Sequence, residues 1–398
     1  MEVREFSSQE AELEALLLEN ADRNKTNEQK VREGIAWEQI EKVKAYKITK
    51  PRLIGDIGLR SFFQLRKRAL QLVKEESIDF VYIPIPSFYV SLIGNYLHKR
   101  TGVKYGIDYI DPWVHTFPGS DKIFSRHWWS TRVARWLEPK AVKKASLITG
   151  VAEGYYKGVR ERNPLLEKSC LFGAMPYGGE IADHEKLKQL DLQPYLFAKN
   201  GKLQFVYAGA MLPKAYGPLE AIFQSIDKNK MEFLNTEFHF IGTGIPNDER
   251  VYNIKPLAEK YGLWQTIVFE YPKRIPYLDV LIHLENADAI FILGSTEIHY
   301  TPSKTYQAVL SKKPVMAILH ERSSAVAIIT NSDAGKVLTF NGEEGIPDIR
   351  NRVALFFESF LIFKKSFNSD NVDQSVFKQF SATAVTEKLS ILLNQVVS

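Results

Sequence analysis

Short apolar runs alternate with longer amphipathic stretches along most of the chain, and this alternation predicts strands and helices in turn. Buried strands are predicted at 79–85, 103–110, 146–151, 203–207, 237–241, 267–269, 289–293 and 314–318. Helices are predicted at 60–76, 90–100, 126–144, 219–229, 250–261, 278–286, 303–310 and 383–396. Strands that alternate with helices form parallel sheets, so we expect an α/β protein.

A polar stretch at 181–202 interrupts the alternation, which restarts after it. We therefore expect two α/β domains, the first over 1–190 and the second over 191–379. A length of 398 residues is ample for two domains. Upstream of the first domain's strands, Ser7 and Glu10 form a capping box that predicts a helix at 7–20.

The net charge of +5 is small for the length and does not indicate nucleic-acid binding, but it is concentrated in one segment. Residues 121–145 carry seven basic side chains against Asp121 and Glu138, which equals the excess of the whole chain. The basic residues are Lys122, Arg126, Arg132, Arg135, Lys140, Lys143 and Lys144. This local basic segment needs an explanation of its own.

The helix predicted within that segment has two readings. One face carries an apolar stripe made of Trp129, Val133, Trp136 and Leu137, and another carries Trp128, Arg132 and Arg135. Either the stripe is core and the charges are solvated, or the helix lies on an anionic membrane surface with Trp128, Arg132 and Arg135 facing the lipid. The pattern leaves both open.

Several classes of site are disfavoured. The single cysteine, Cys170, excludes a disulfide framework, and the histidines show no metal-ligand spacing, so no metal and no cofactor are expected. The acidic N-terminal stretch lacks the apolar core of a signal peptide. The longest uncharged run contains Pro84 and Pro86, which favour a strand and a turn over one long helix. We expect a cytoplasmic protein.

Three turns follow strands of the second domain and could hold a phosphorylated ligand. They contain Gly209, the pair Gly242 and Gly244, and the pair Ser303 and Lys304. Ligands of open parallel sheets bind at the carboxyl ends of strands, where helix N-termini offer free N–H groups. Each turn taken alone is more often a tight connection that binds nothing, and it is the three together that favour a phosphorylated ligand.

Together the segments resemble a known family. The carriers are FVYAGAMLPKAYGPLEAI at 205–222, FHFIGTG at 238–244, RIPYLDVLIHLENADAIFIL at 274–293, TPSKTYQAVLSKKPVMAIL at 301–319 and SDAGKVL at 332–338, with GIDYIDPWV at 106–114, ASLITGVAEGYYKGV at 145–159 and FSATAVTEKLSILL at 380–393. They are similar to the retaining glycosyltransferases of family 4, which have the GT-B fold. The resemblance implies two facing Rossmann-like domains, an acceptor-side first domain, a nucleotide-sugar-binding second domain, and a C-terminal helix, 380–398, that crosses back to the first.

The resemblance also implies roles for particular residues. The donor site would contain Gly209, Lys214, Gly242, Gly244, Ser303, Lys304, Tyr306 and Gln307. Lys304 and Gln307 are expected to share one helix face at the cleft surface. Asp111 could bind or deprotonate the acceptor, or it could only cap a turn before Pro112. A turn at Tyr177, Gly178 and Gly179 would be the hinge, with glycine in a left-handed conformation.

The chain also departs from the family pattern. The family's two glutamates, spaced Glu-x7-Glu, fall on His299 and Gln307, and Ala210 replaces an arginine. His299 could face the reacting sugar or be a plain loop residue. No glycine precedes Gly34, so the family's opening strand and glycine-rich turn are not evident. A short first domain of this kind would be expected to have low stability.

The expected activity is sugar transfer, with retention, from a nucleoside-diphosphate sugar to a glycan or a lipid-linked glycan. Two alternatives stay open because of the departures. One is a non-catalytic GT-B relative that binds glycan or a partner enzyme, and the other is a sugar-nucleotide epimerase. The expected partners are the donor, the acceptor and an anionic membrane surface, at the inner face of which the protein would lie peripherally, with no nucleic acid.

Overall fold

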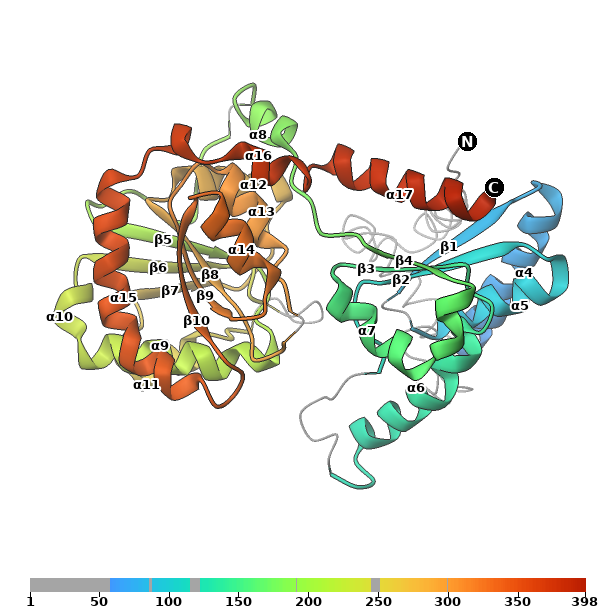
Figure 1. Ribbon diagram of the computed structural model, residues 1–398. Coiled ribbons are helices and arrows are strands. Elements are labelled where there is room, and N and C mark those ends of the chain that lie inside the picture. Colours follow the sequence, from blue (N-terminus) through green and yellow to red (C-terminus); the bar gives the residue numbers. More distant parts are fainter. Residues whose placement is uncertain (1–57, 86–87, 115–121, 191, 245–250, 299) are drawn as a thin grey trace, which may run out of the picture.

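The computed structural model describes residues 58–398 except 86–87, 115–121, 191, 245–250 and 299, and these residues form two α/β lobes (Figure 1). The helix predicted at 7–20, the question of the opening strand, and His299 lie outside the described residues. Among the described helices, none combines the length and apolar character that a membrane crossing needs.

The first lobe contains a four-stranded parallel sheet in the order β1-β2-β3-β4. Its strands are β1 (Phe80–Ile85), β2 (Lys104–Tyr109), β3 (Leu147–Gly150) and β4 (Leu171–Ala174). Its helices are α4 (Leu59–Glu75), α5 (Ser91–Thr101), α6 (Arg126–Val142) and α7 (Glu153–Arg162). Ile85, Leu97 and Ile107 are fully buried between the sheet and the helices, as the apolar runs predict.

The second lobe contains a six-stranded parallel sheet in the order β10-β9-β8-β5-β6-β7. The strands are β5 (Leu203–Ala208), β6 (Thr236–Ile241), β7 (Val268–Tyr271), β8 (Ala289–Leu293), β9 (Val315–His320) and β10 (Gly335–Phe340). The strand order reverses between β5 and β8, which is the topological switch point of a Rossmann-like sheet. The predicted fold class, two parallel α/β domains, is confirmed.

The helices of the second lobe cover both faces of its sheet. They are α8 (Ile181–Leu187), α9 (Tyr216–Lys228), α10 (Lys230–Phe233), α11 (Lys255–Lys260), α12 (Tyr277–Asn286), α13 (Lys304–Leu310), α14 (Ser324–Asn331), α15 (Ile346–Ser366) and α16 (Gln374–Lys378). Helix α8 already packs on α12, where the hydroxyl of Tyr277 donates to Asp183 at 2.9 Å. The polar stretch at 181–202 is therefore helical at its start.

Two chain segments cross between the lobes side by side. The N–H of Gly179 donates to the carbonyl of Phe380 at 3.0 Å, and Gly179 forms a parallel bridge with Ser381. Helix α17 (Ala382–Val397) then lies on the first sheet, where Leu393 and Val396 pack with Leu147 (Figure 1). The expected return of the C-terminal helix to the first domain is confirmed.

The hinge glycines serve a different purpose from the one predicted. Neither Gly178 nor Gly179 has a positive φ. A Cβ on Gly178 would lie 2.8 Å from the carbonyl oxygen of Phe380, and one on Gly179 would lie 2.7 Å from Leu310 Cδ1. The expectation of left-handed glycine is wrong here, because glycine is favoured by the close approach of the second crossing segment at Gly178 and of α13 at Gly179, not by backbone conformation.

Candidate functional site

The carboxyl ends of β5 and β8 form the edge of the second sheet that contains the switch point. Gly209 follows β5 with φ +128°, a conformation open to glycine and strained for other residues. Gly294 and the buried Ser295 follow β8. Ligands of Rossmann-like sheets bind at this position, so the charged side chains that reach it are candidates for ligand binding.

Lys304, the first residue of α13, extends over the end of β5. Its Nζ donates to the hydroxyl of Tyr207 at 2.8 Å and lies 3.9 Å from the centre of that ring. A Cβ on Gly209 would lie 2.2 Å from Lys304 Cε. Gly209 is therefore needed both for its backbone conformation and to leave room for the lysine.

The charge of Lys304 is not balanced by the protein around it. Among the described residues no carboxylate pairs with it, and burial lowers the pKa of its amine to about 7. An anion placed beside Nζ would favour the protonated form and raise that pKa again. Lys304 is therefore an amine whose protonation would respond to a bound anion.

The glycine turns do not offer the free N–H groups that the sequence suggested. The N–H of Gly209 donates to Ile241, that of Gly242 to Tyr271, and that of Gly244 to Pro272, at 2.7–2.9 Å. Gly242 has φ +70° and Gly244 does not have a positive φ. Since all three donors are already bonded within the sheet edge, an anion at this edge would depend on side chains.

Lys214 lies at the same edge but already has a partner. It belongs to the short helix Pro213–Ala215, and its Nζ lies 3.5 Å from Glu297 Oε1. Its carbonyl accepts the N–H of Thr296 at 3.1 Å. The turns after β5 and β8 are thereby tied together, and Lys214 contributes less unbalanced charge than Lys304.

The remaining predicted donor residues do not converge on Lys304. Ser303 is exposed and makes no side-chain cap bond. Tyr306 is only 1% exposed and packs between Phe377 and Phe380, as a core side chain. Gln307 lies 3.3 Å from His184 of α8. The side chains of Lys304 and Gln307 thus have different contacts, Lys304 with Tyr207 of β5 and Gln307 with His184 of α8.

Gln307 instead lines a shallow groove where the two crossing segments meet. The groove has a volume of about 320 Å³, and its other walls include Gly179, Asp183, Tyr277 and Val385. His184 also lies 2.7 Å from Glu285, through its other ring nitrogen. Gln307 thus belongs to a polar chain that attaches α8 to the second domain.

Across the junction, Asp111 faces tyrosines of both domains. Asp111 follows β2 and is exposed. Burial is the main cause that raises the pKa values of Tyr155, Tyr177 and Tyr300, that of Tyr177 to about 12. The negative charge of Asp111 is among the smaller causes that raise them. The N–H of Thr301 lies 3.5 Å from the Tyr155 hydroxyl. The structure therefore places Asp111 where the domains meet.

Asp108, three residues earlier on β2, is a second acid that the sequence analysis did not single out. Its Oδ1 accepts from the hydroxyl of Thr149 at 2.7 Å, and Tyr82 lies 2.6 Å from the same hydroxyl. Burial raises the pKa of Asp108, against the effect of these hydrogen bonds. An acid inside a mostly buried strand was the signal that could have identified it.

The described residues contain no group of three His, Cys, Asp or Glu side chains placed to hold a metal ion. Cys170 is buried, and burial raises the pKa of its thiol to about 12.

No protein-family model matches the chain, and no curated protein sequence matches it either. Solved structures do. A glycosyltransferase from Rickettsia africae ESF-5 is 16% identical with a TM-score of 0.55, and the match covers 86% of this chain and 83% of that one. HepE of Anabaena in complex with UDP is 14% identical with a TM-score of 0.55, covering 83% and 82%.

A UDP-forming alpha,alpha-trehalose-phosphate synthase from Burkholderia vietnamiensis is 10% identical with a TM-score of 0.59, covering 85% of this chain and 80% of that one. Identities this low report on architecture, and all three matches extend over both lobes. The chain has the GT-B fold of two Rossmann-like domains.

Proposed function

We propose that this protein is a glycosyltransferase that moves a sugar, with retention, from a nucleoside-diphosphate sugar to a hydroxyl of a glycan or lipid-linked glycan. One observation supports it above the others. Lys304 is a partly buried cation without a carboxylate partner among the described residues, and it lies at the switch point of the second sheet. A diphosphate is the group that such a position suits.

In this proposal, residues of both domains take part in the reaction. Protonated Lys304 would stabilise the negative charge that develops on the departing diphosphate, and the phenol of Tyr207 orients its Nζ. Asp111, on the first domain, would bind an acceptor hydroxyl or accept its proton. The structural neighbour HepE binds UDP and UDP-glucose, so a uridine-diphosphate sugar is the first donor to test.

A non-catalytic GT-B protein is the second candidate, and two observations favour it. The N–H groups of Gly209, Gly242 and Gly244 are already bonded, and Gln307 is turned toward His184. Both reduce the number of groups available to a donor. Such a protein would bind glycan or a partner enzyme without releasing a nucleoside diphosphate.

Calorimetry with UDP, GDP and ADP, together with release of nucleoside diphosphate from the corresponding donor sugars, separates these functions. Lys304→Met should weaken nucleoside-diphosphate binding by roughly 1.5–3 kcal/mol, the scale of a charge-assisted hydrogen bond. The matched control is Lys336→Met, which removes an exposed lysine from above another aromatic ring, that of Phe363. Equal affinity in both variants would contradict the donor site, and binding without release would support the second candidate.

A lipid-linked acceptor would bring the protein to a membrane, where we place it peripherally, on the cytoplasmic face. The first lobe has a surface suited to that position.

A further inference from the structure

Four large apolar side chains lie exposed at one end of the first lobe. Ile123 is 69% exposed, Phe124 74%, Trp129 52% and Trp136 64%. They belong to α6 and to the turn that precedes it. We call residues 122–144, with these side chains, the α6 surface.

The apolar stripe of α6 is not core. The helix buries Ala134, Glu138, Ala141 and Val142 against the rest of the domain. Trp129 and Trp136, seven residues apart, lie about two turns from each other on the opposite side. Of the two readings that the sequence left open, the core reading is wrong for both tryptophans.

The charge of the α6 surface has one sign. All seven of its basic residues are exposed, and its one acidic residue within 122–144, Glu138, is fully buried. Arg162 of α7 donates to both oxygens of Glu138, at 2.7 and 2.9 Å. The outward side of α6 is therefore cationic and apolar, with no exposed carboxylate.

Cations and aromatic rings are paired along this surface. The guanidinium of Arg132 lies 4.1 Å from the centre of the Trp128 ring, and Lys140 Nζ lies 3.1 Å from the centre of the Trp136 ring. This corrects the predicted membrane-facing set, because Trp128 is partly buried beneath Arg132. Arg132 and Arg135 remain exposed, as that set requires.

In the turn before α6, the residue with the exposed aromatic ring, Phe124, has an unfavourable backbone conformation. Phe124 has φ +65°, a left-handed conformation that is unfavourable for a residue with a bulky side chain. Ser125 then caps the helix by accepting the N–H of Trp128 at 3.0 Å. The Phe124 ring lies 5.5 Å from that of Trp128 and 6.3 Å from that of Trp129, so these three rings form one cluster.

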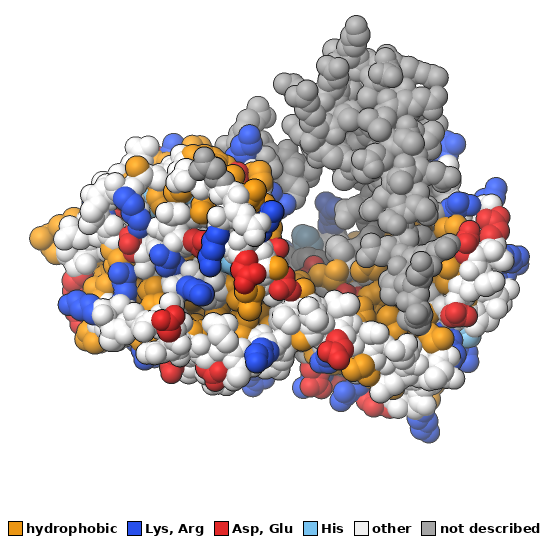
Figure 2. All heavy atoms as spheres, turned by 90° about the horizontal axis from the view of Figure 1, so that it is seen from above, with side chains coloured by type: hydrophobic (Ala, Val, Ile, Leu, Met, Phe, Trp, Pro, Cys, Tyr) orange, Lys and Arg blue, Asp and Glu red, His pale blue; other side chains and the backbone are white. Residues whose placement is uncertain are grey.

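The cluster lies on a different side of the first lobe from α17. The N-terminal half of α6 extends away from the lobe, on the side opposite α17 (Figure 1). On the face that carries α17, acidic and basic side chains are intermixed (Figure 2). The face that carries α17 therefore does not have the single sign of charge found on the outward side of α6.

We propose that the α6 surface docks on an anionic lipid membrane. Ile123, Phe124, Trp129 and Trp136 would enter the headgroup region, where tryptophan is favoured, and the seven basic side chains would lie against the lipid phosphates. An aliphatic side chain beside exposed rings fits an acyl boundary better than a nucleic-acid backbone. The proposal does not depend on the chemistry of the cleft, so it and the proposed function can fail separately.

Vesicle sedimentation of the full chain tests it. Vesicles of phosphatidylcholine with 30% phosphatidylglycerol, as an example of an anionic surface, are compared with phosphatidylcholine alone. We expect binding to the anionic vesicles only, and a loss of at least about tenfold in partition coefficient in Arg132→Glu/Arg135→Glu, because four units of charge change next to the membrane. Phe124→Ser/Trp129→Ser should lose binding by a similar factor, with less sensitivity to salt.

The matched control is Arg350→Glu/Arg352→Glu, which reverses two exposed charges on α15 of the second lobe and should bind as the wild type does. Circular dichroism and nucleoside-diphosphate affinity, measured on every variant, exclude misfolding. Equal binding by wild type and Arg132→Glu/Arg135→Glu overturns the proposal. So does binding to RNA or to an acidic protein with none to anionic vesicles.

Discussion

At the scale of single residues, Lys304 is a partly buried amine whose ionisation depends on what lies beside it. The burial that lowers its pKa to about 7 acts in the free protein, and a bound diphosphate would raise that pKa. Binding therefore takes up a proton above pH 7. We expect the dissociation constant for a nucleoside diphosphate to rise as pH increases above 7, by up to about tenfold per unit.

Calorimetry between pH 7 and 9 in two buffers of different ionisation enthalpy measures that proton uptake directly. Lys304→Arg provides the control, since arginine stays charged over this range and should bind with a nearly flat profile. A pH profile of the wild type as flat as that of the arginine variant would contradict the assignment.

Asp111 is the residue whose loss should separate donor binding from transfer. It lies on the first domain, across the junction from Lys304. If it accepts the acceptor proton, Asp111→Asn should lower kcat by about 100-fold or more while donor affinity stays the same. The control is Asp183→Asn, which changes an acid that lines the groove where the two crossing segments meet. It should keep kcat within a few-fold of the wild type. A large loss of donor affinity in Asp111→Asn would assign the aspartate to the donor side instead.

At the scale of elements, α6 is attached to the first domain by an ion pair whose carboxylate is buried and whose guanidinium is partly exposed. Glu138 is fully buried and depends on Arg162 for both of its oxygens. Arg162→Met would leave a buried carboxylate without its cation. We expect the free energy of unfolding to fall by about 3–5 kcal/mol.

Urea unfolding of three variants tests the pair. Glu138→Gln/Arg162→Met removes both charges and should recover part of the loss, because the uncompensated charge is gone. Arg160→Met, on the same helix but in exposed pairs with Glu153 and Glu167, should change stability by less than about 1 kcal/mol. A loss in Arg162→Met as small as that in Arg160→Met would show that the buried pair does not hold α6.

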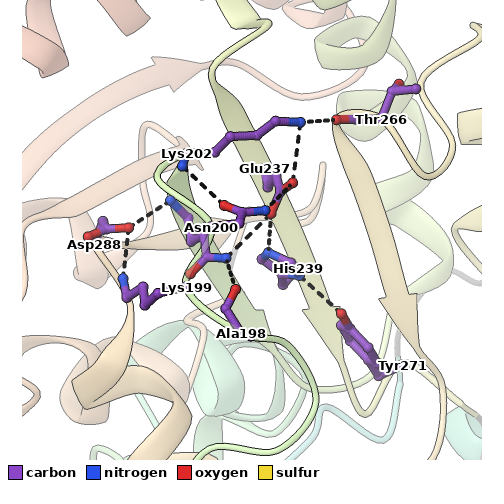
Figure 3. A network of polar contacts seen from close by, with 10 residues as sticks. Ala198, Lys199, Asn200, Lys202, Glu237, His239, Thr266, Tyr271 and Asp288 are labelled. Carbon is purple, nitrogen blue, oxygen red and sulfur yellow. Dashed lines mark hydrogen bonds and ion pairs between the residues drawn. The ribbon is translucent and has the colours of Figure 1, made fainter.

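At the scale of the whole molecule, a buried polar network lies at the edge of the second sheet where the strands begin. The proposed donor site lies at the other edge, where the strands end. Glu237 and His239 of β6 lie at the centre of the network, with Asn200 and Lys202 from the segment leading into β5 (Figure 3). The His239 ring stacks on Phe197 at 3.9 Å between centres. This network joins the interdomain segment to the sheet.

Low pH should therefore lower the stability of the second domain through this network. Burial lowers the pKa of His239 below its ordinary value of 6.5, so below pH 6.5 the unfolded chain binds a proton that the folded protein does not. The pKa of Glu237 is also lowered, by bonds from Asn200, Gln204 and Lys202 that outweigh its burial, and its contribution is lost at still lower pH. Both effects reduce stability as pH falls.

Urea midpoints at pH 7.5, 6.5, 5.5 and 4.5 measure this loss. His239→Gln should be less stable at pH 7.5 but should lose less on going to pH 5.5, because it no longer carries the titrating ring. His127→Gln is the control, since its histidine is exposed on α6 and should follow the wild-type profile. Identical slopes for wild type and His239→Gln between pH 6.5 and 5.5 would exclude the mechanism.

Local patterns in the sequence were enough to predict the fold class and the edge of the second sheet at which the candidate site lies. Alternating apolar and amphipathic stretches depend on backbone periodicity, so they located most strands and helices, and the turns at Gly209 and Lys304 marked the edge of the second sheet. Helix α15 was not predicted because it has apolar residues on several sides, among them the exposed Leu355 and Ile362. The strand β4 was not predicted either.

Only the tertiary structure decided what surrounds each side chain. It placed Lys304 on Tyr207, turned Gln307 to His184, buried Tyr306 between two phenylalanines, and brought Asp111 to the tyrosines of both domains. It also left Trp129 and Trp136 exposed on α6, although their spacing is the same as that of a core stripe. Periodicity determines that residues share one face of a helix, whereas the packing of other elements determines whether that face meets the core, a ligand or solvent.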